Sequence, residues 1–216
     1  LLSVFMLAGM GVGSWMESFV PKIQKVLFSS NDLYLTTNIR LQQKFAEVEV
    51  TPLGWESLLP NEERLVLDKY QKLKPETPET LGDMTAQILR SIEASTDTAY
   101  QSAMYSMNSV ATFDEKQVEI SGFVVPIEFH QDNTPNLVFL VPYYGACLHF
   151  PPPPPNQISF ARLEPGFKQE DLKQAYSFKG VIRQSLFEDP MGTSAYEIDV
   201  AAINVFAGQP DDFRAH

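Results

Sequence analysis

The sequence contains a single cysteine among its 216 residues, Cys147, so the chain has no internal disulfide. Basic residues are also scarce, with 16 Lys and Arg against 27 Asp and Glu, which gives a formal net charge of −11. Phosphate binding depends on Lys and Arg replacing counterions, so this deficit argues against nucleic acid and against anionic membrane surfaces as partners. The acidity favours solubility, or a cationic partner or metal ion.

The motifs of several common enzyme classes are missing as well. The sequence has no phosphate-binding loop, no GxSxG or HExxH motif and no glycine-rich dinucleotide fingerprint. We therefore expect a protein that is not an enzyme and needs no cofactor. The hydrophobic fraction of 44% nevertheless predicts a globular fold with a substantial core.

The first 16 residues carry no charge, since none occurs before Glu17. This stretch is short for a membrane span, which takes about 20 apolar residues, and it suits the apolar core of an export signal. We interpret residues 1–16 as a signal-like or membrane-anchoring segment; a buried helix of the mature fold is the alternative. Met10 stands where a lipid-modified cysteine would be required, which excludes lipid attachment there.

Residues 17–115 form a predicted helical region. Apolar residues at helical spacing indicate an amphipathic helix at residues 19–27, and a second helix is expected from about Asn61. A segment rich in proline and acidic residues, at residues 74–80, is expected to interrupt the helices. A further short helix is expected over residues 96–107.

The clearest helical pattern in this region follows the break. Five apolar residues fall at i, i+3, i+7, i+8 and i+11, which predicts an amphipathic helix. These residues are Leu81, Met84, Ile88, Leu89 and Ile92.

From residue 116 the pattern changes to the period-two alternation typical of strands. Five strands are expected over residues 117–129, 136–144, 157–163, 176–187 and 195–206, with a short helix over residues 168–175. This is the order of an OB-fold barrel, and Gly122 would let the long first strand bend around a small barrel. We therefore predict an α+β protein with an OB-like β-barrel domain at residues 116–208 and a tail at residues 209–216. A meander sandwich is the alternative.

The stretch GACLHFPPPPPNQ, residues 145–157, combines the cysteine with five consecutive prolines. Prolines fix φ and lack a donor, so the five form an extended rod of about 15 Å. We predict a partner-binding surface here; the alternatives are packing across the open edge of the barrel and a rigid mount for a ligand or metal site. The predicted binding residues are Tyr143, Tyr144, Phe150, Pro151, Pro152, Pro153, Pro154, Pro155, Asn156 and Gln157.

Cys147 and His149 are two residues apart, so on an extended segment their side chains point to one face. Thiolate and imidazole are suitable ligands for zinc or copper, and His130 or a carboxylate would complete the site. A lone cysteine is more often a small core residue. A reactive thiol is a third interpretation, although no orienting acid or oxyanion donor is identifiable.

Three segments resemble the signature of an uncharacterised bacterial family: WESLLP at residues 55–60, GFVVPIE at residues 122–128 and VPYYGACLHFPPPPPNQ at residues 141–157. The resemblance covers about residues 117–206. It implies exported, periplasmic proteins that are often encoded beside ABC transporters and have no assigned enzymatic activity. The long extension before WESLLP and the helical insertion at about residues 81–107 depart from a plain member, and both suit protein contacts.

We therefore expect a non-enzymatic periplasmic accessory protein of an inner-membrane ABC transporter, held at that membrane if residues 1–16 stay attached. The alternative is a periplasmic protein that binds or delivers zinc or copper through Cys147 and His149.

Overall fold

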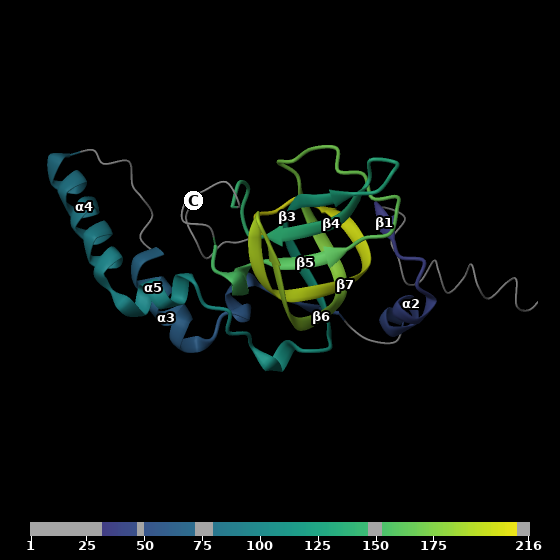
Figure 1. Cartoon of the computed structure of the whole chain (residues 1–216), viewed down its shortest axis with the longest axis horizontal. Helices are drawn as coiled ribbons and strands as arrows, with labels where there is room; N and C mark the ends of the chain where they lie inside the picture. Colours follow the sequence, from purple (N-terminus) through teal and green to yellow (C-terminus); the bar gives the residue numbers. More distant parts are fainter. Residues whose placement is uncertain (1–31, 47–49, 72–79, 147–152, 211–216) are drawn as a thin grey trace, which may run out of the picture.

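The computed structural model of the chain describes residues 32–46, 50–71, 80–146 and 153–210. The molecule is elongated, with a curved sheet at its centre and three helices reaching out on one side (Figure 1). The segment predicted at residues 1–16, the helix predicted at residues 19–27 and nearly all of the break predicted at residues 74–80 lie outside the described residues.

The three helices that reach out are α3 (Asn61–Gln71), α4 (Leu81–Thr96) and α5 (Thr98–Met104), here called the helical annex. They confirm three of the predicted helices, namely the one from about Asn61, the amphipathic helix from Leu81 and the short helix within residues 96–107. Helix α4 begins in a capping box, in which the Asp83 amide donates to Thr80 Oγ1 and the Thr80 amide donates to the Asp83 carboxylate. Asp97 then caps α5 by accepting from the amides of Ala99 and Tyr100.

The five predicted strands are present, each within a few residues of its expected bounds. They are β3 (Lys116–Phe129), β4 (Pro135–Val141), β5 (Ser159–Arg162), β6 (Ala175–Asp189) and β7 (Gly192–Phe206). Strand β3 pairs with β6 through its first half and with β4 through its second half. Because β4 also pairs with β5, β5 with β7 and β7 with β6, the pairing forms a closed circuit. The protein is thus of the α+β class.

Further short elements, which the sequence did not predict, lie at the edges. Strand β1 (Tyr34–Leu35) pairs with β7, and β2 (Thr51–Pro52) pairs with β3. Helix α2 (Ile39–Ala46) begins after Asn38, whose Oδ1 accepts from the amides of Arg40 and Leu41. Three 3-10 turns complete the described elements: η1 (Trp55–Leu58), η2 (Ala111–Phe113) and η3 (Pro155–Gln157).

The helix predicted over residues 168–175 is wrong. Asp171 Oδ1 accepts from the amide of Lys173 at 2.8 Å, and the amide of Gln174 donates to the Asp171 carbonyl at 3.2 Å. These local bonds compete with a helix. Leu172 is 61% exposed, so no buried face stabilises a helix, and Ala175 is already the first residue of β6.

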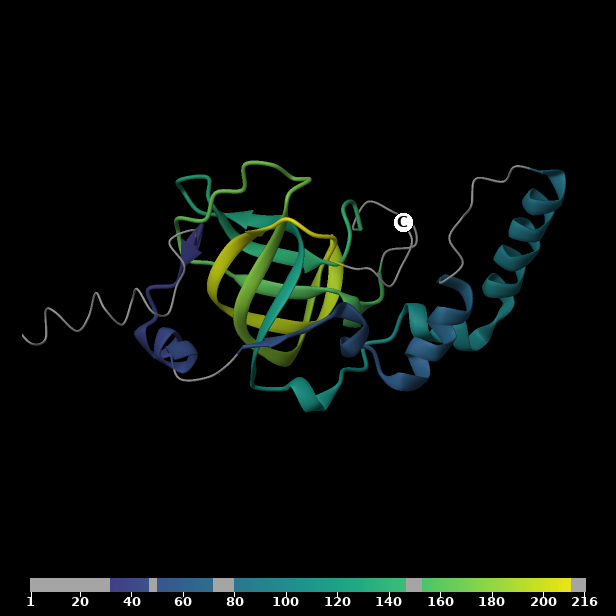
Figure 2. The same cartoon turned by 180° about the vertical axis from the view of Figure 1, so that it is seen from behind.

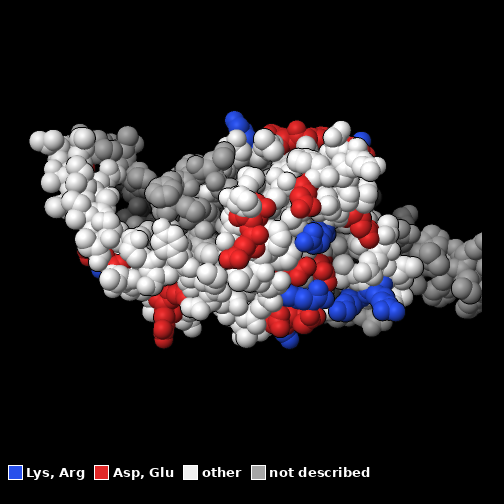
Figure 3. All heavy atoms as spheres, in the orientation of Figure 1, with Lys and Arg blue, Asp and Glu red and all other residues white. Residues whose placement is uncertain are grey.

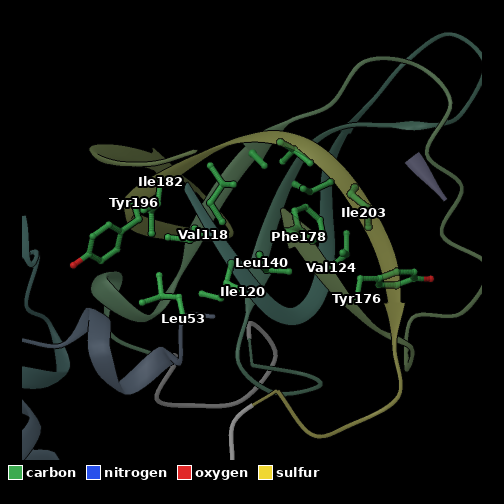
Figure 4. Packing of buried hydrophobic residues seen from close by; sticks show 14 of the residues in the cluster. Leu53, Val118, Ile120, Val124, Leu140, Tyr176, Phe178, Ile182, Tyr196 and Ile203 are labelled. Atoms are coloured by element: carbon green, nitrogen blue, oxygen red, sulfur yellow. The ribbon is translucent and has the colours of Figure 1, made fainter. Parts of the chain in front are cut away.

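The main hydrophobic core fills the inside of the strand circuit (Figure 4). Tyr176 and Tyr196 lie at opposite ends of this core, with their rings buried. Gly122 is required where β3 begins to pair with β4, because a Cβ there would lie 2.7 Å from the Val141 carbonyl oxygen. At this point β3 exchanges its pairing with β6 for pairing with β4, while its register shifts fall later, between Pro126 and Phe129.

None of the helices in the described ranges is long and apolar enough to cross a membrane.

Candidate functional site

The three segments that carry the family resemblance meet in space. Trp55, in η1, is 1% exposed, and its Nε1 donates to the Ser121 carbonyl at 2.8 Å, one residue before the GFVVPIE segment. Gln157 Nε2, at the end of the proline stretch, donates to the Trp55 carbonyl at 2.8 Å. The segments lie up to 102 residues apart in the chain, so only the tertiary fold joins them.

Glu63 of α3 is the centre of a polar network at the same place. Its carboxylate accepts from Asn156 Nδ2 at 2.8 Å, from Ser106 Oγ at 2.6 Å and from Asn108 Nδ2 at 2.7 Å. Asn156 is fully buried and also donates to the Asn108 carbonyl at 3.0 Å. We call Trp55, Glu63, Asn108, Asn156 and Gln157 the junction, because they hold the helical annex to the strands.

Tyr196 of β7 ties the strands to both ends of the annex. Its hydroxyl donates to the Leu58 carbonyl at 2.9 Å and accepts from the Val110 amide at 2.6 Å. Burial of the side chain raises the pKa of Tyr196 to about 12. The hydroxyl therefore stays protonated at neutral pH and acts as a structural tie.

The predicted binding residues have different environments. Asn156 and Gln157 are fully buried and bind the chain itself. Pro153 and Pro154 are buried and Pro155 is half-buried. Tyr143 packs half-buried against the apolar residues on the outer side of β4 and β5, whereas Tyr144 is 47% exposed. Phe150, Pro151 and Pro152 lie outside the described residues.

The predicted metal ligands Cys147 and His149 also lie outside the described residues. His130, proposed as a third ligand, ends the strand region of β3, and its Nε2 is 2.8 Å from the Leu163 carbonyl oxygen. Within the described ranges, no group of three or more His, Cys, Asp or Glu side chains is arranged to hold a metal ion. The metal site stays a prediction.

A groove of about 370 Å³, here called the edge groove, lies between the β3–β4 turn and the segment in which the helix was wrongly predicted. Four of its nine lining residues are apolar and five are polar, among them one cation and one anion. The lining residues are Pro126, Phe129, Asp132, Asn133, Thr134, Pro135, Lys168, Gln169 and Leu172. Phe129 and Leu172 are 58% and 61% exposed, so two large apolar side chains here have no cover.

The groove follows a strand edge that is closed to pairing. In the described part of the chain, β3 from Val124 to Phe129 pairs only with β4. Pro126 has no N–H to offer on this edge, and Gln169 Nε2 donates to the Val124 carbonyl at 2.9 Å. Edge prolines and capped carbonyls are devices that prevent strand addition. A ligand would therefore use side chains here rather than extend the sheet.

Two polar groups give the groove chemical character. Gln169 lines the groove, and its buried Oε1 has no hydrogen-bond partner among the described atoms. On the other side of the groove, the Asp132 carboxylate accepts hydrogen bonds from the hydroxyl and the amide of Thr134. These bonds, with the hydroxyl as the larger cause, lower the pKa of Asp132 and keep its carboxyl group ionised.

Tyr144 is an exposed aromatic side chain outside the lining of the groove. Its ring packs edge-on against Phe123 with the ring centres 6.1 Å apart. Lys173, the neighbour of the groove residue Leu172, places its ammonium 6.0 Å from the Tyr144 ring centre. Sequence reasoning selected Tyr144 but missed Phe129, Gln169 and Leu172. The only signal was the pair of prolines Pro126 and Pro135, before and within the turn at residues 130–136, because no local pattern places residues 168–172 beside β3.

Comparison with known proteins gives a family and a fold. A family model described as "Protein of unknown function (DUF3299)" matches residues 55–205. The crystal structure of a DUF3299 family protein from Pseudomonas aeruginosa PAO1, at 2.45 Å resolution, superposes with a TM-score of 0.52 and 23% identity, covering 74% of this chain and 99% of that one.

A predicted aspartyl-tRNA synthetase from Leishmania major Friedlin superposes with a TM-score of only 0.28 and 12% identity, over 57% of this chain and 26% of that one. No curated protein matches. The family match extends over more than half of the sequence and confirms the resemblance to an uncharacterised family. The chain therefore belongs to the DUF3299 family of proteins of unknown function.

Proposed function

We propose that this chain is a non-enzymatic periplasmic accessory protein that binds a partner protein through the edge groove and Tyr144, and that the partner is a subunit of an inner-membrane ABC transporter. The observation that carries the proposal is the groove itself, where Phe129, Leu172 and Tyr144 expose large apolar surface around a buried acceptor without a partner. Clustered surface of this kind marks protein interaction sites.

The groove specifies what the partner must supply. An apolar side chain would cover Phe129 and Leu172, and an N–H or O–H donor would reach Gln169 Oε1. Lys168 and Asp132 line the same groove with opposite charges, so a partner with the complementary pair would dock in one orientation. Tyrosine beside such a groove suits an interface, because its ring is large and rigid and its hydroxyl tolerates water.

We also propose that the strand circuit is an OB-like barrel. When the strands are numbered in chain order from β3 as strand 1 to β7 as strand 5, they pair in the closed order 1–2–3–5–4–1. Folds of this type commonly bind ligands beside the loop that joins the first two strands, which here lines the groove. A net charge of −11 argues against nucleic acid as that ligand.

The choice of a periplasmic transporter as partner comes from the family resemblance of the signature segments. The junction supports an accessory role in a different way. Hydrogen bonds within the chain hold the annex to the strands through Trp55, Asn156 and Gln157, so these residues belong to a rigid scaffold.

A photoreactive phenylalanine placed at Phe129 in the native bacterium tests the proposal. Irradiation is expected to join the chain to an ABC transporter subunit, which mass spectrometry identifies. The same group at Leu186, which is 56% exposed but lies outside the groove, is the control and is expected to give no such product. Equal products from both positions, or no transporter product from either, would contradict the proposal.

Substitution in the groove gives a second readout. Leu172→Glu is expected to lower affinity for the captured partner at least about tenfold, because a charge enters an apolar contact. Leu65→Glu, at a side chain that is 67% exposed on α3, is the matched control and should leave binding unchanged. Both sites are exposed, so folding should change by less than about 0.5 kcal/mol.

A further inference from the structure

Helix α4 exposes a continuous apolar stripe, here called the α4 stripe. Its members are Leu81 (81% exposed), Met84 (48%), Ile88 (59%), Leu89 (62%) and Ile92 (54%). No residue of α4 is buried. In a surface helix of a globular protein this stripe normally faces the core, so its exposure calls for an occupant outside the described fold.

The helix packs on the annex with the opposite face. The three least exposed residues of α4 are Ala86, Gln87 and Ala94, and Gln101 of α5 donates to the Ala94 carbonyl at 3.3 Å. Contact with α5 therefore uses small and polar side chains. The apolar face is turned away from the described part of the chain.

The charged residues of α4 are kept off the stripe and are largely used within the chain. At 3.6 residues per turn, Asp83, Arg90 and Glu93 each lie about 140° or more around the helix from Ile88. Asp83 belongs to the capping box, and the Glu93 carboxylate pairs with Lys69 Nζ at 2.9 Å. The exposed face thus carries no charge for a charged partner to recognise.

We propose that the α4 stripe pairs with the α4 stripe of a second copy of this chain, as an antiparallel helix pair across a twofold axis at Ile88. In this register Ile88 faces its own counterpart, Met84 faces Ile92 of the second copy, and Leu81 faces Ser95 of the second copy. Twofold interfaces are self-complementary by construction, and an uncharged apolar stripe satisfies that condition without bringing like charges together.

The shape of the molecule permits this contact despite the net charge. In both views α4 lies at the end of the molecule away from the strands (Figure 1 and Figure 2). Charged side chains gather over the strands, whereas the upper part of α4 on the visible face has none (Figure 3). When two copies meet at α4, their acidic strand regions stay apart. Repulsion between these regions is then largely screened, because the screening length at physiological salt is only about 8 Å.

The size of the contact sets the expected strength. Two helices of 16 residues bury less than the roughly 800 Å² per partner of a standard stable interface. The dimer is therefore expected to be reversible and concentration-dependent. The inference does not rest on the proposed function, because the edge groove and α4 are separate surfaces on different elements.

Analytical ultracentrifugation of the full chain over a wide concentration range tests the inference. The chain is expected to pass from monomer to dimer, and Ile88→Glu is expected to weaken the dimer by about a hundredfold or more, since it buries two like charges at the axis. Leu65→Glu and Leu172→Glu are matched controls at other exposed leucines and should dimerise normally. A chain that stays monomeric, or a dimer that survives Ile88→Glu, overturns the inference.

Disulfide trapping tests the register, in a Cys147→Ser background that removes the natural thiol. Ile88→Cys is expected to form a covalent dimer rapidly, whereas Arg90→Cys, on the opposite side, is not. A mixture of Met84→Cys and Ile92→Cys chains should give the mixed dimer in preference to either like pair. Like pairs from Met84→Cys, or equal rates at positions 88 and 90, would overturn the antiparallel pair. Loss of dimerisation with an intact Phe129 crosslink would remove this inference and leave the proposed function standing.

Discussion

Strand β3 and helix α4 are both amphipathic in sequence, yet the fold treats their apolar faces in opposite ways. Val118 and Ile120 of β3 are fully buried, whereas Ile88 and Ile92 of α4 are 59% and 54% exposed. The apolar face of β3 is covered because the strand circuit turns it onto the main core, where side chains of the other strands pack against it. The stripe on α4 has no such neighbour among the described residues. A pattern therefore predicts the element, and the surrounding fold decides what covers it.

The difference has an energetic meaning. Fully burying a leucine or isoleucine side chain is worth about 1.5–3 kcal/mol. The inner face of β3 contributes this free energy to folding of the single chain. The α4 stripe contributes comparable free energy only when another surface covers it, so it is available for association.

The largest loss is expected at the junction, where the two regions are joined. Trp55→Ala should cost about 3–5 kcal/mol of folding free energy, because it removes a buried indole and leaves the Ser121 carbonyl without its donor. Urea unfolding followed by circular dichroism measures the change. Trp55→Phe, which keeps a ring but no N–H, should lose less. Equal costs would mean that the hydrogen bond, and not packing, dominates.

A smaller effect, confined to the contact between the annex and the strands, is expected at Asn156. Asn156→Ala removes the donor to Glu63 and to the Asn108 carbonyl, and should cost about 1–3 kcal/mol. Hydrogen exchange should show faster opening of α3 and α5 than of the strands. Uniform acceleration throughout the chain would show that the junction does not separate the two regions.

The tie at Tyr196 predicts a dependence on alkaline pH. The folded pKa of about 12 lies above the ordinary value of 10.0, so the unfolded chain releases the proton first. The stability from this difference is complete below pH 10 and is lost as the pH rises toward 12. Tyr196→Phe should be less stable at neutral pH but should show a shallower decline over this window. An unchanged slope would remove Tyr196 as the cause.

The smallest effect on folding is expected at the α4 stripe. Ile88→Ala should change the stability of the dilute, monomeric chain by less than about 0.5 kcal/mol. The matched substitution Ile120→Ala, at a fully buried side chain of β3, should cost about 2–5 kcal/mol. Thermal unfolding at low protein concentration compares the two. Similar costs would mean that the α4 stripe is already covered in the monomer.

Much of the secondary structure was predictable because its signals are local. Alternation along β6 and β7 predicted strands whose members Tyr176, Phe178 and Ile198 indeed lie in the core. The helix predicted over residues 168–175 failed because the Asp171 turn and the Gln169 bond to Val124 satisfy those polar groups in another way. The strands β1 and β2 have two residues each, too few for any periodicity to indicate them.

The site was less predictable than the fold. Sequence reasoning selected Tyr144, which is exposed beside the groove, and also Asn156 and Gln157, which are buried and bind the chain itself. An asparagine or glutamine looks the same in a sequence whether its amide binds a ligand or the main chain. The groove residues Phe129 and Leu172 come from segments that no local pattern connects.

The sequence by itself determined the α+β class, the order of the five strands and the amphipathic character of α4, because hydrophobic periodicity and caps act over a few residues. Only the tertiary structure decided three other things: that Trp55, Glu63 and Gln157 meet, that an edge groove lies beside β3, and that the α4 stripe faces outward. Each of these depends on contacts between residues distant in the chain. Such contacts form only after the strands have paired and the annex has been placed, so no local pattern encodes them.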